Sequence, residues 1–381
     1  MVDRNRLVAL FLELVQIDSL SRKEREVALR VKQELEALSA EVVIDEAGEK
    51  VGGNTGNVIA RIKGNVPTAP SLLLSAHMDT VVPGEGVKPL VEGDLIKTDG
   101  RTILGGDDKS GIAIICEVIR TLKERSLPHG DIEAVFTICE EVGLLGAKHL
   151  DFSRLKSRYG LVLDSDEVAR LITKAPAANR IEFRVHGLEA HAGVCPERGI
   201  NAIKVAAEAI AQMRLGRIDP ETTANIGVIQ GGMATNIVPN YVIVRGEARS
   251  HDESKLEDQT AHMRRCFQEA AARYRLVLDD RMYGAKVEEE VWHDYPKMEI
   301  PEHSRIVRLI LEAAEKTGLK VETASTGGGS DANIFNRYGI EAVNIGTGMR
   351  AIHTVNEYLD VQEMLQSAQL LLQVLRLNAS P

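Results

Sequence analysis

The chain of 381 residues is poor in cysteine, in aromatic residues and in long apolar runs. It has 4 cysteines, one tryptophan and 4% aromatic residues. The cysteines are far apart and form no C-x-x-C pair, which predicts reduced, mostly buried thiols. No apolar run approaches the roughly 18–20 residues that cross a bilayer, and the first residues lack the apolar core of a signal peptide. These absences predict a cytoplasmic protein.

The chain also lacks an excess of positive charge. It has 46 Lys and Arg against 56 Asp and Glu, a formal net charge of −10. Attraction to phosphate backbones or anionic lipid needs clustered Lys and Arg, so we expect no nucleic acid or membrane partner. With 44% hydrophobic and 27% charged residues, the composition excludes collagen-like, disordered and coiled-coil proteins.

A nucleotide-binding loop is missing as well. The chain has no G-x-G-x-x-G turn followed by an acidic residue, which argues against a nucleotide- or flavin-dependent oxidoreductase. The run Gly327-Gly328-Gly329 lacks the G-x-x-x-x-G-K-[ST] form of a phosphate loop, which argues against ATP binding.

What is present is an alternation of short apolar runs with helix-length segments. Residues 3–38 are typical of two amphipathic helices, the second opened by a capping box of Ser21 and Glu24. Apolar runs follow at 41–44, 57–60, 71–74, 133–136 and 161–163, with helices expected near 109–124 and 143–150. Strands that are apolar on both faces predict an α/β domain, with a mostly parallel sheet covered by helices on both sides.

Residues 179–291 have a different texture. The strands expected at 180–185 and 241–245 alternate apolar and polar residues, and helices are expected at 199–216 and 252–273. This pattern predicts an α+β domain inserted into a discontinuous catalytic domain of residues 1–178 and 292–381. Helices near 303–318 and 361–377 and a strand near 342–345 complete the catalytic domain.

Polar residues collect where the apolar runs end. The segments concerned hold His77 and Asp79, Asp107 and Asp108, Glu140 and Glu141, Asp164 and Asp166, and His353. One such carboxylate alone is usually a solvated loop residue. Several at the carboxyl ends of buried strands repel one another, and a divalent cation is the usual compensation. The number of ligands exceeds that of one zinc ion and fits two cations that share a bridging carboxylate.

Spacing within the segments suggests further roles. In an extended strand the side chains of His77 and Asp79 face the same way, so Asp79 can accept the second ring N–H of His77 and fix its tautomer. An ordinary structural His–Asp hydrogen bond would show the same spacing. Glu140 and Glu141 both reach the centre only if the chain turns, as Gly143 allows. One of them is then a ligand, and the other is a spare carboxylate suited to general-base catalysis.

These segments resemble those of the M20 family of di-zinc peptidases and amidohydrolases, most closely its peptidase T-like branch. The matching stretches are residues 75–81, 105–111, 137–143, 163–165, 190–193 and His353. Several separated motifs in the family's order are far more specific than one fingerprint. The resemblance implies that Asp107 bridges two metal ions. His77 and Asp164 would complete one site, and Glu141 and His353 the other.

The resemblance also implies roles for residues that are not ligands. Glu140 would be the general base and Asp79 the partner of His77. Residues 179–291 would form a lid or dimerisation domain of a homodimer, in which His191 stabilises the oxyanion, although His191 also suits a turn. The implied substrate contacts are Asn236, Arg249, Gly328 and Gly329; Arg249 alone is equally typical of a solvated strand edge.

The expected activity is metal-dependent hydrolysis of an amide bond in a short peptide, of aminopeptidase type, by a metal-bridging water that Glu140 activates. Zinc is the expected metal, with manganese and cobalt as alternatives. An N-acyl amino acid deacylase or a carboxypeptidase of the same family remains an alternative. Gly327 stands where peptidase T has an Arg that would hold a substrate carboxylate, which argues against strict tripeptidase specificity. A non-catalytic binding protein is a distant alternative, since no metal or base position is broken.

Overall fold

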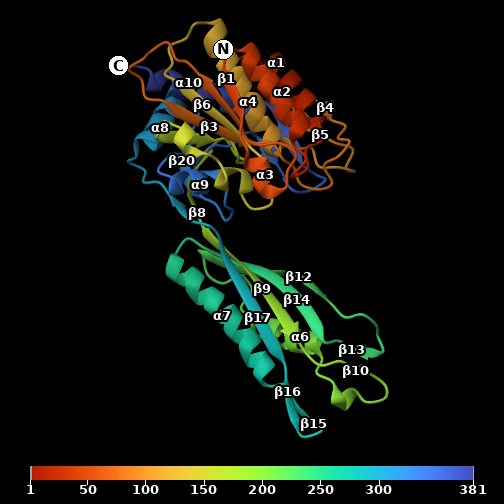
Figure 1. Ribbon diagram of the computed structural model, residues 1–381. Coiled ribbons are helices and arrows are strands. Elements are labelled where there is room, and N and C mark those ends of the chain that lie inside the picture. The colour runs from red at the N-terminus through yellow and green to blue at the C-terminus, as the bar shows by residue number, and fades with distance from the viewer. Residues whose placement is uncertain (1, 381) are drawn as a thin grey trace. The chain divides into compact units, whose positions relative to one another are not determined.

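The computed structural model describes residues 2–380. The chain divides into two compact units (Figure 1). Unit 1 comprises Met1–Lys174, Met298–Thr326 and Ser330–Pro381, and unit 2 comprises Ala175–Lys297 and Gly327–Gly329. Among the described residues, no helix is long and apolar enough to cross a membrane.

The boundaries of unit 2 differ from residues 179 and 291 expected from the sequence. Its first long strand begins at Ala177 and its last ends at Tyr295, so each strand extends beyond the expected boundary. The run Gly327–Gly329 belongs to unit 2 rather than to the catalytic part. The physical reason is close packing: a β-carbon on Gly329 would lie 2.3 Å from the ring of Tyr295.

Unit 1 is built on a nine-stranded sheet. Its strands in spatial order are β1 (Glu41–Ile44), β2 (Val58–Ile62), β6 (Ile132–Thr137), β3 (Leu72–His77), β7 (Tyr159–Val162), β20 (Glu341–Asn344), β8 (Arg170–Ala175) and β18 (Met298–Glu299), with β19 (Glu322–Ser325) paired to β8. The strands β6, β3, β7 and β20 run parallel, whereas β1–β2 and β2–β6 are antiparallel. The carboxyl ends of the four parallel strands therefore meet at one edge of the sheet.

Helices cover both faces of this sheet. Every residue of its central strands β3 and β6 is therefore buried. One layer contains α1 (Arg4–Val15), α2 (Arg25–Ala37), α4 (Gly106–Glu124), α8 (Arg305–Thr317) and α10 (Val361–Asn378). The other contains α3 (Ala47–Val51), α5 (Leu145–Lys148) and α9 (Asp331–Arg337). A 3₁₀ turn, η1 (Phe152–Arg154), and a small sheet of β4 (Leu90–Glu92), β5 (Leu95–Lys97), β22 (Tyr358–Asp360) and β21 (Met349–Arg350) complete the unit.

The start of α2 differs from the expected capping box. Glu24 is the N-cap residue and makes no side-chain cap hydrogen bond. Its carboxylate instead accepts the N–H groups of Arg22 at 2.9 Å and of Cys139 at 3.0 Å, and the Ser21 hydroxyl donates to Asp79 at 2.6 Å. The prediction of a capping box is therefore wrong, because both side chains are used by residues at the strand ends described below.

Unit 2 has a five-stranded antiparallel sheet with helices on one face (Figure 1). The strands in order are β11 (Gly216–Arg217), β12 (Thr222–Gly231), β14 (Tyr241–Ser250), β9 (Ala177–His186) and β17 (Lys286–Tyr295). The remaining elements are α6 (Ala202–Gln212), α7 (Glu253–Ala272), η2 (Pro196–Arg198) and the strand pairs β10 (Ala190–His191) with β13 (Ile237–Val238) and β15 (Arg275–Leu278) with β16 (Arg281–Gly284). The hydrophobic core of unit 2 lies on the helix-covered face of the sheet. In it the rings of Phe183 and Phe267 stack with their centroids 3.9 Å apart.

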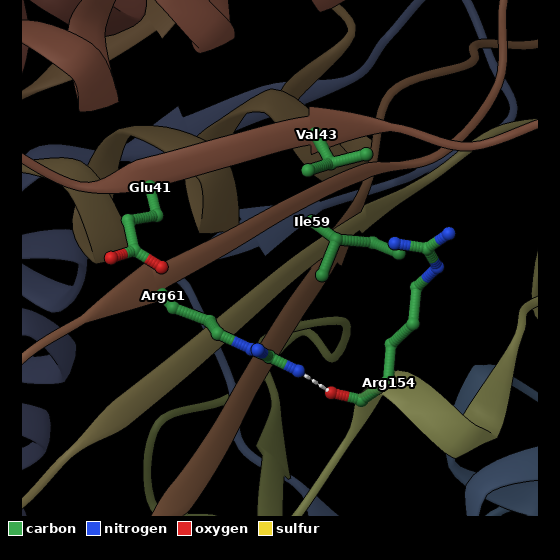
Figure 2. Close-up of a pocket in the computed structure, with 5 residues that line it drawn as sticks. All are labelled: Glu41, Val43, Ile59, Arg61 and Arg154. Atoms are coloured by element: carbon green, nitrogen blue, oxygen red, sulfur yellow. Dashed lines mark hydrogen bonds between the residues drawn. The ribbon is translucent and has the colours of Figure 1, made fainter.

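A small pocket lies beside the edge strand β1, away from the carboxyl ends of the parallel strands (Figure 2). It is lined by Glu41, Val43, Ile59, Arg61 and Arg154, and the Arg61 guanidinium donates a hydrogen bond to the Arg154 carbonyl oxygen. Its volume is about 80 Å³. Sites for small molecules usually have roughly 300–1,000 Å³, so this pocket is not a candidate substrate site.

The stacked pair in unit 2 gives a stability prediction. Replacing Phe267 by alanine removes a fully buried ring, and we expect the free energy of unfolding of unit 2 to fall by about 3–5 kcal/mol. Denaturant unfolding followed by circular dichroism would measure it. Val277→Ala, at an exposed position in the same unit, serves as the control and should change stability by less than about 0.5 kcal/mol. A Phe267→Ala protein as stable as the control would contradict the assignment of this core.

Candidate metal centre

Acidic and imidazole side chains gather at the edge where the parallel strands end. His77 is the last residue of β3, and Asp164 follows β7 by two positions. Glu140 and Glu141 follow β6. Asp107 lies at the start of α4, where its backbone angles are not helical (φ −81°, ψ 102°), so it belongs to the loop that leads into the helix.

The Asp107 carboxylate lies between two imidazoles. Its Oδ1 is 2.9 Å from Nε2 of His77, and its Oδ2 is 3.1 Å from Nε2 of His353. The same nitrogen of His353 is 3.0 Å from Oε1 of Glu141. Candidate ligand atoms of His77, Asp107 and Glu141 all lie within 4.8 Å of one another. One carboxylate thus has an imidazole on each side, the arrangement expected of a ligand shared by two cations.

A second group consists of His77, Asp108 and Asp164, whose candidate ligand atoms also lie within 4.8 Å. Asp108 is not among the site residues expected from the sequence. Its Oδ2 accepts the backbone N–H of His77 at 3.2 Å, and its Oδ1 accepts that of Gly111 at 3.2 Å. Its position directly after Asp107 in the strand-end segment is the signal that points to it.

Burial leaves most of these carboxylates poorly solvated. It is the main cause that raises the pKa of Glu140 well above its ordinary value and also raises the pKa of Glu141. Burial, followed by the nearby charge of Asp107, raises the pKa of Asp164 to about 8. The cause is that these carboxyl groups lie out of water and close to other carboxylates.

The pKa of Asp107 is lowered and that of His353 is raised, because each partner stabilises the charged form of the other. Burial works to raise the pKa of Asp107, but hydrogen bonds with His353 and His77 outweigh it and hold that pKa below its ordinary value. The hydrogen bonds to Asp107 and Glu141 raise the pKa of His353 to about 10. Lys109 does not pair with the carboxylates, because its Nζ donates to the carbonyl oxygen of Ile17 at 2.7 Å.

The donor set fits divalent cations. Imidazole nitrogen and carboxylate oxygen are the ligands that zinc, manganese and cobalt accept. The His77 Nδ1–H donates to the backbone carbonyl oxygen of Asp79 at 2.9 Å, and its Nε2 faces Oδ1 of Asp107 at 2.9 Å. A cation at Nε2 would take the place of the proton on that nitrogen, with Nδ1 still donating to Asp79.

The Asp79 carboxylate has partners besides His77. It lies 3.5 Å from Nδ1 of His77, farther than the Asp79 carbonyl oxygen. Its oxygens accept the backbone N–H of Glu140 at 2.8 Å and of Glu141 at 3.2 Å, and the hydroxyl of Ser21 at 2.6 Å. Because β3 ends at His77, Asp79 lies beyond the strand and also reaches the next segment.

The chain turns where Glu140 and Glu141 leave the sheet. The turn begins at Cys139 (φ 52°), earlier than Gly143, the residue that the sequence suggested. The Glu140 carbonyl oxygen accepts the N–H groups of Gly143 at 3.0 Å and Leu144 at 2.8 Å. The Cys139 N–H donates to the buried Glu24 carboxylate at 3.0 Å.

Asp331 is a buried acid near this group that is not among the site residues expected from the sequence. Its Oδ2 accepts the Thr137 hydroxyl, and its Oδ1 has no hydrogen-bond partner among the described residues. Burial raises its pKa to about 6. Proximity to the strand ends could not be read from the sequence, because residues 137 and 331 are brought together only by the fold.

The other expected site residues lie in unit 2. His191 of β10 is exposed and pairs with Ile237 of β13, and the neighbouring Ala192 N–H donates to the Asn236 carbonyl oxygen at 2.9 Å. The Arg249 guanidinium donates to both carboxylate oxygens of Glu247, at 2.9 and 3.0 Å. It also donates to the carbonyl oxygen of Gly327, next to Gly328 and Gly329, at 3.4 Å.

Comparison with known proteins assigns the family. The model of the peptidase family M20/M25/M40 matches residues 73–377. A protein of Bacillus subtilis named uncharacterized protein YqjE is 43% identical over 98% of this chain and 99% of its own length.

Two solved structures resemble the chain over its whole length. The aminopeptidase PepT of Bacillus cereus has 40% identity, a TM-score of 0.87 and coverage of 100% of both chains. A tripeptidase of Staphylococcus aureus has 39% identity and a TM-score of 0.91, with coverage of 100% of this chain and 99% of its own. The α/β fold and the family resemblance expected from the sequence are confirmed. The chain belongs to the peptidase family M20/M25/M40 and is a hydrolase of its peptidase T-like branch.

Proposed function

We propose that this metal-dependent peptidase is an aminopeptidase that removes the N-terminal residue of di- and tripeptides and holds two zinc ions. The observation that carries the proposal is the Asp107 carboxylate, whose two oxygens lie 2.9 and 3.1 Å from the imidazole nitrogens of His77 and His353. The similar Bacillus cereus and Staphylococcus aureus proteins, named an aminopeptidase and a tripeptidase, support the substrate class.

The proposed ligands are His77 and Asp164 on one side of Asp107, and Glu141 and His353 on the other. When bound, the two cations supply polarisation of the scissile carbonyl and lower the pKa of the attacking water. The Asp79 carbonyl oxygen keeps His77 in the tautomer that binds metal. The Asp79 carboxylate holds the backbone of Glu140 and Glu141.

Glu140 is the proposed general base. It is buried, lies outside both groups of candidate ligands and is adjacent to a candidate ligand, Glu141. Its carboxylate takes a proton from the attacking water and later delivers that proton to the leaving amine.

Unit 2 is the proposed lid and dimerisation domain of a homodimer. His191 would stabilise the oxyanion, and Arg249, Asn236, Gly328 and Gly329 would contact the substrate. The Glu247 carboxylate orients the Arg249 guanidinium, which suits recognition of a substrate carboxylate.

Val228 and Ile229 of β12 are exposed apolar residues that support a second copy as partner. The four free cysteines support a reducing, cytoplasmic location.

Two adjacent glutamates should separate catalysis from metal binding. Glu140→Gln removes the base, and we expect kcat to fall by about 10²–10⁴-fold while metal content stays at two ions per chain. Glu141→Gln is the matched variant and should lose metal. Activity on tripeptides and elemental analysis would be measured on the same samples. A Glu140→Gln protein with the parent's kcat would contradict the assignment.

Removing the metal should lower both activity and stability. Without cations the buried carboxylates repel one another, so a chelator should abolish hydrolysis and lower the melting temperature. Bound metal at 100–1,000 times its Kd contributes about 3–4 kcal/mol. Zinc, manganese and cobalt would be added back separately and compared. Full hydrolysis by metal-free protein would overturn the proposal.

Arg249 should affect substrate binding more than turnover. For Arg249→Gln we expect KM for a tripeptide to rise by about 10–100-fold with kcat changed much less, since a charge-assisted hydrogen bond to substrate is lost. Arg245→Gln, four residues earlier on β14, is the control and should leave KM unchanged. Comparing tripeptides with N-acyl amino acids tests the deacylase alternative. Equal KM values for the two variants would remove Arg249 from the site.

A further inference from the structure

Glu357 is a buried glutamate that the expected site does not include. It follows His353 by four residues and is 1% exposed. Its Oε2 accepts the backbone N–H groups of Leu104 at 2.7 Å and Gly105 at 2.8 Å. Its Oε1 accepts the backbone N–H of Asp107 at 3.0 Å. One carboxylate thus receives three backbone donors from the loop that carries Asp107.

The backbone donors of this loop that lie before the helix find their acceptor in Glu357. The backbone of Asp107 and Asp108 is not helical, so the N–H groups before the regular part of α4 lack acceptors within the helix. Gly105 has a left-handed backbone (φ 76°). A β-carbon on Gly106 would lie 3.0 Å from Oε1 of Glu357, so loop and carboxylate are in close contact. The position of Asp107 therefore depends on Glu357.

Burying a carboxylate here has a cost that a neutral side chain would avoid. A charge out of water, close to another carboxylate, is unfavourable unless hydrogen bonds compensate it. Glutamine would be neutral, but it has only one acceptor oxygen. Its amide NH₂ would face either the Asp107 N–H or the N–H groups of Leu104 and Gly105. Only a carboxylate accepts all three donors.

We propose that Glu357 is a positioning residue that fixes the bridging carboxylate of Asp107 relative to His353. Both His353 and Glu357 lie in one short segment, and the Glu357 hydrogen bonds join it to a loop about 250 residues earlier. One segment thereby supplies a ligand and holds the shared ligand in place. The inference rests on the metal centre proposed above.

The test is Glu357→Gln in the full chain. We expect the dissociation constant for zinc to rise by about 10–100-fold, and kcat to fall by a similar factor at limiting zinc. KM for a tripeptide should stay within twofold, because Glu357 touches no proposed substrate contact. Zinc affinity would be measured by competition with a chelator on metal-free protein, a measurement that does not depend on activity.

Glu133→Gln is the matched control. Glu133 is also a buried glutamate in unit 1, and its carboxylate accepts the backbone N–H groups of Lys156 and Ser157 at 2.9–3.0 Å. It lies at the start of β6, whereas the metal centre is at the other end of that strand. The Glu133→Gln substitution should lower the stability of the metal-free protein without changing its zinc affinity. Equal zinc affinity in Glu357→Gln and the parent, or an equal loss in both variants, would overturn the proposal.

Hydrogen exchange on the parent keeps the proposal testable if Glu357→Gln does not fold. In the metal-free parent, the amide of Asp107 should exchange slowly because Glu357 accepts it. Exchange at the rate of an unprotected amide would overturn the proposal. A parent protein that binds no metal would refute the proposed metal centre, while slow exchange at Asp107 would still support the hydrogen bond.

Discussion

The structure of unit 1 depends on the placement of several carboxylates out of water at one edge of a sheet. Asp107, Glu140, Asp331 and their neighbours repel one another there, and burial raises the pKa of Glu140 well above its ordinary value and that of Asp331 to about 6. Lys109, which follows Asp107 and Asp108 in the sequence, does not pair with these carboxylates, because its Nζ donates to a backbone carbonyl oxygen. Divalent cations are the compensation that fits, because they supply concentrated positive charge to oxygen and imidazole ligands.

The acids of this edge divide into two kinds by what faces their oxygens. The oxygens of Asp107 face imidazole nitrogens, and those of Asp79, Asp108 and Glu357 accept backbone N–H groups of ligand-bearing segments. The second kind fixes the loops in which the first kind lies. A loop that must hold a ligand to within a fraction of an ångström needs such support, because its own backbone is not part of a helix or a ladder.

The sequence predicted the acids that face imidazole nitrogens, but it missed most of the acids that accept backbone N–H groups. Strand ends are visible as apolar runs followed by His, Asp or Glu, so His77 and Glu141 could be named as candidates from the chain alone. Glu357 and Glu24 could not, because their hydrogen bonds join residues more than 100 positions apart. For the same reason the capping box at Ser21 was wrong: local pattern favoured it, but tertiary contacts used both side chains. The helices and strands that were expected lie where periodicity placed them, with boundaries shifted by a few residues, whereas β8, β12 and β17 were not expected.

Adjacent residues acquire different tasks here through backbone geometry rather than residue type. Glu140 and Glu141 have the same side chain, yet only Glu141 lies within hydrogen-bond distance of His353. The left-handed turn at Cys139 takes the pair out of the strand, and Asp79 accepts both of their N–H groups. A strand would have sent the two side chains to opposite faces. Since one carboxylate accepts both backbone N–H groups, Asp79 holds Glu140 and Glu141 in a fixed position relative to each other.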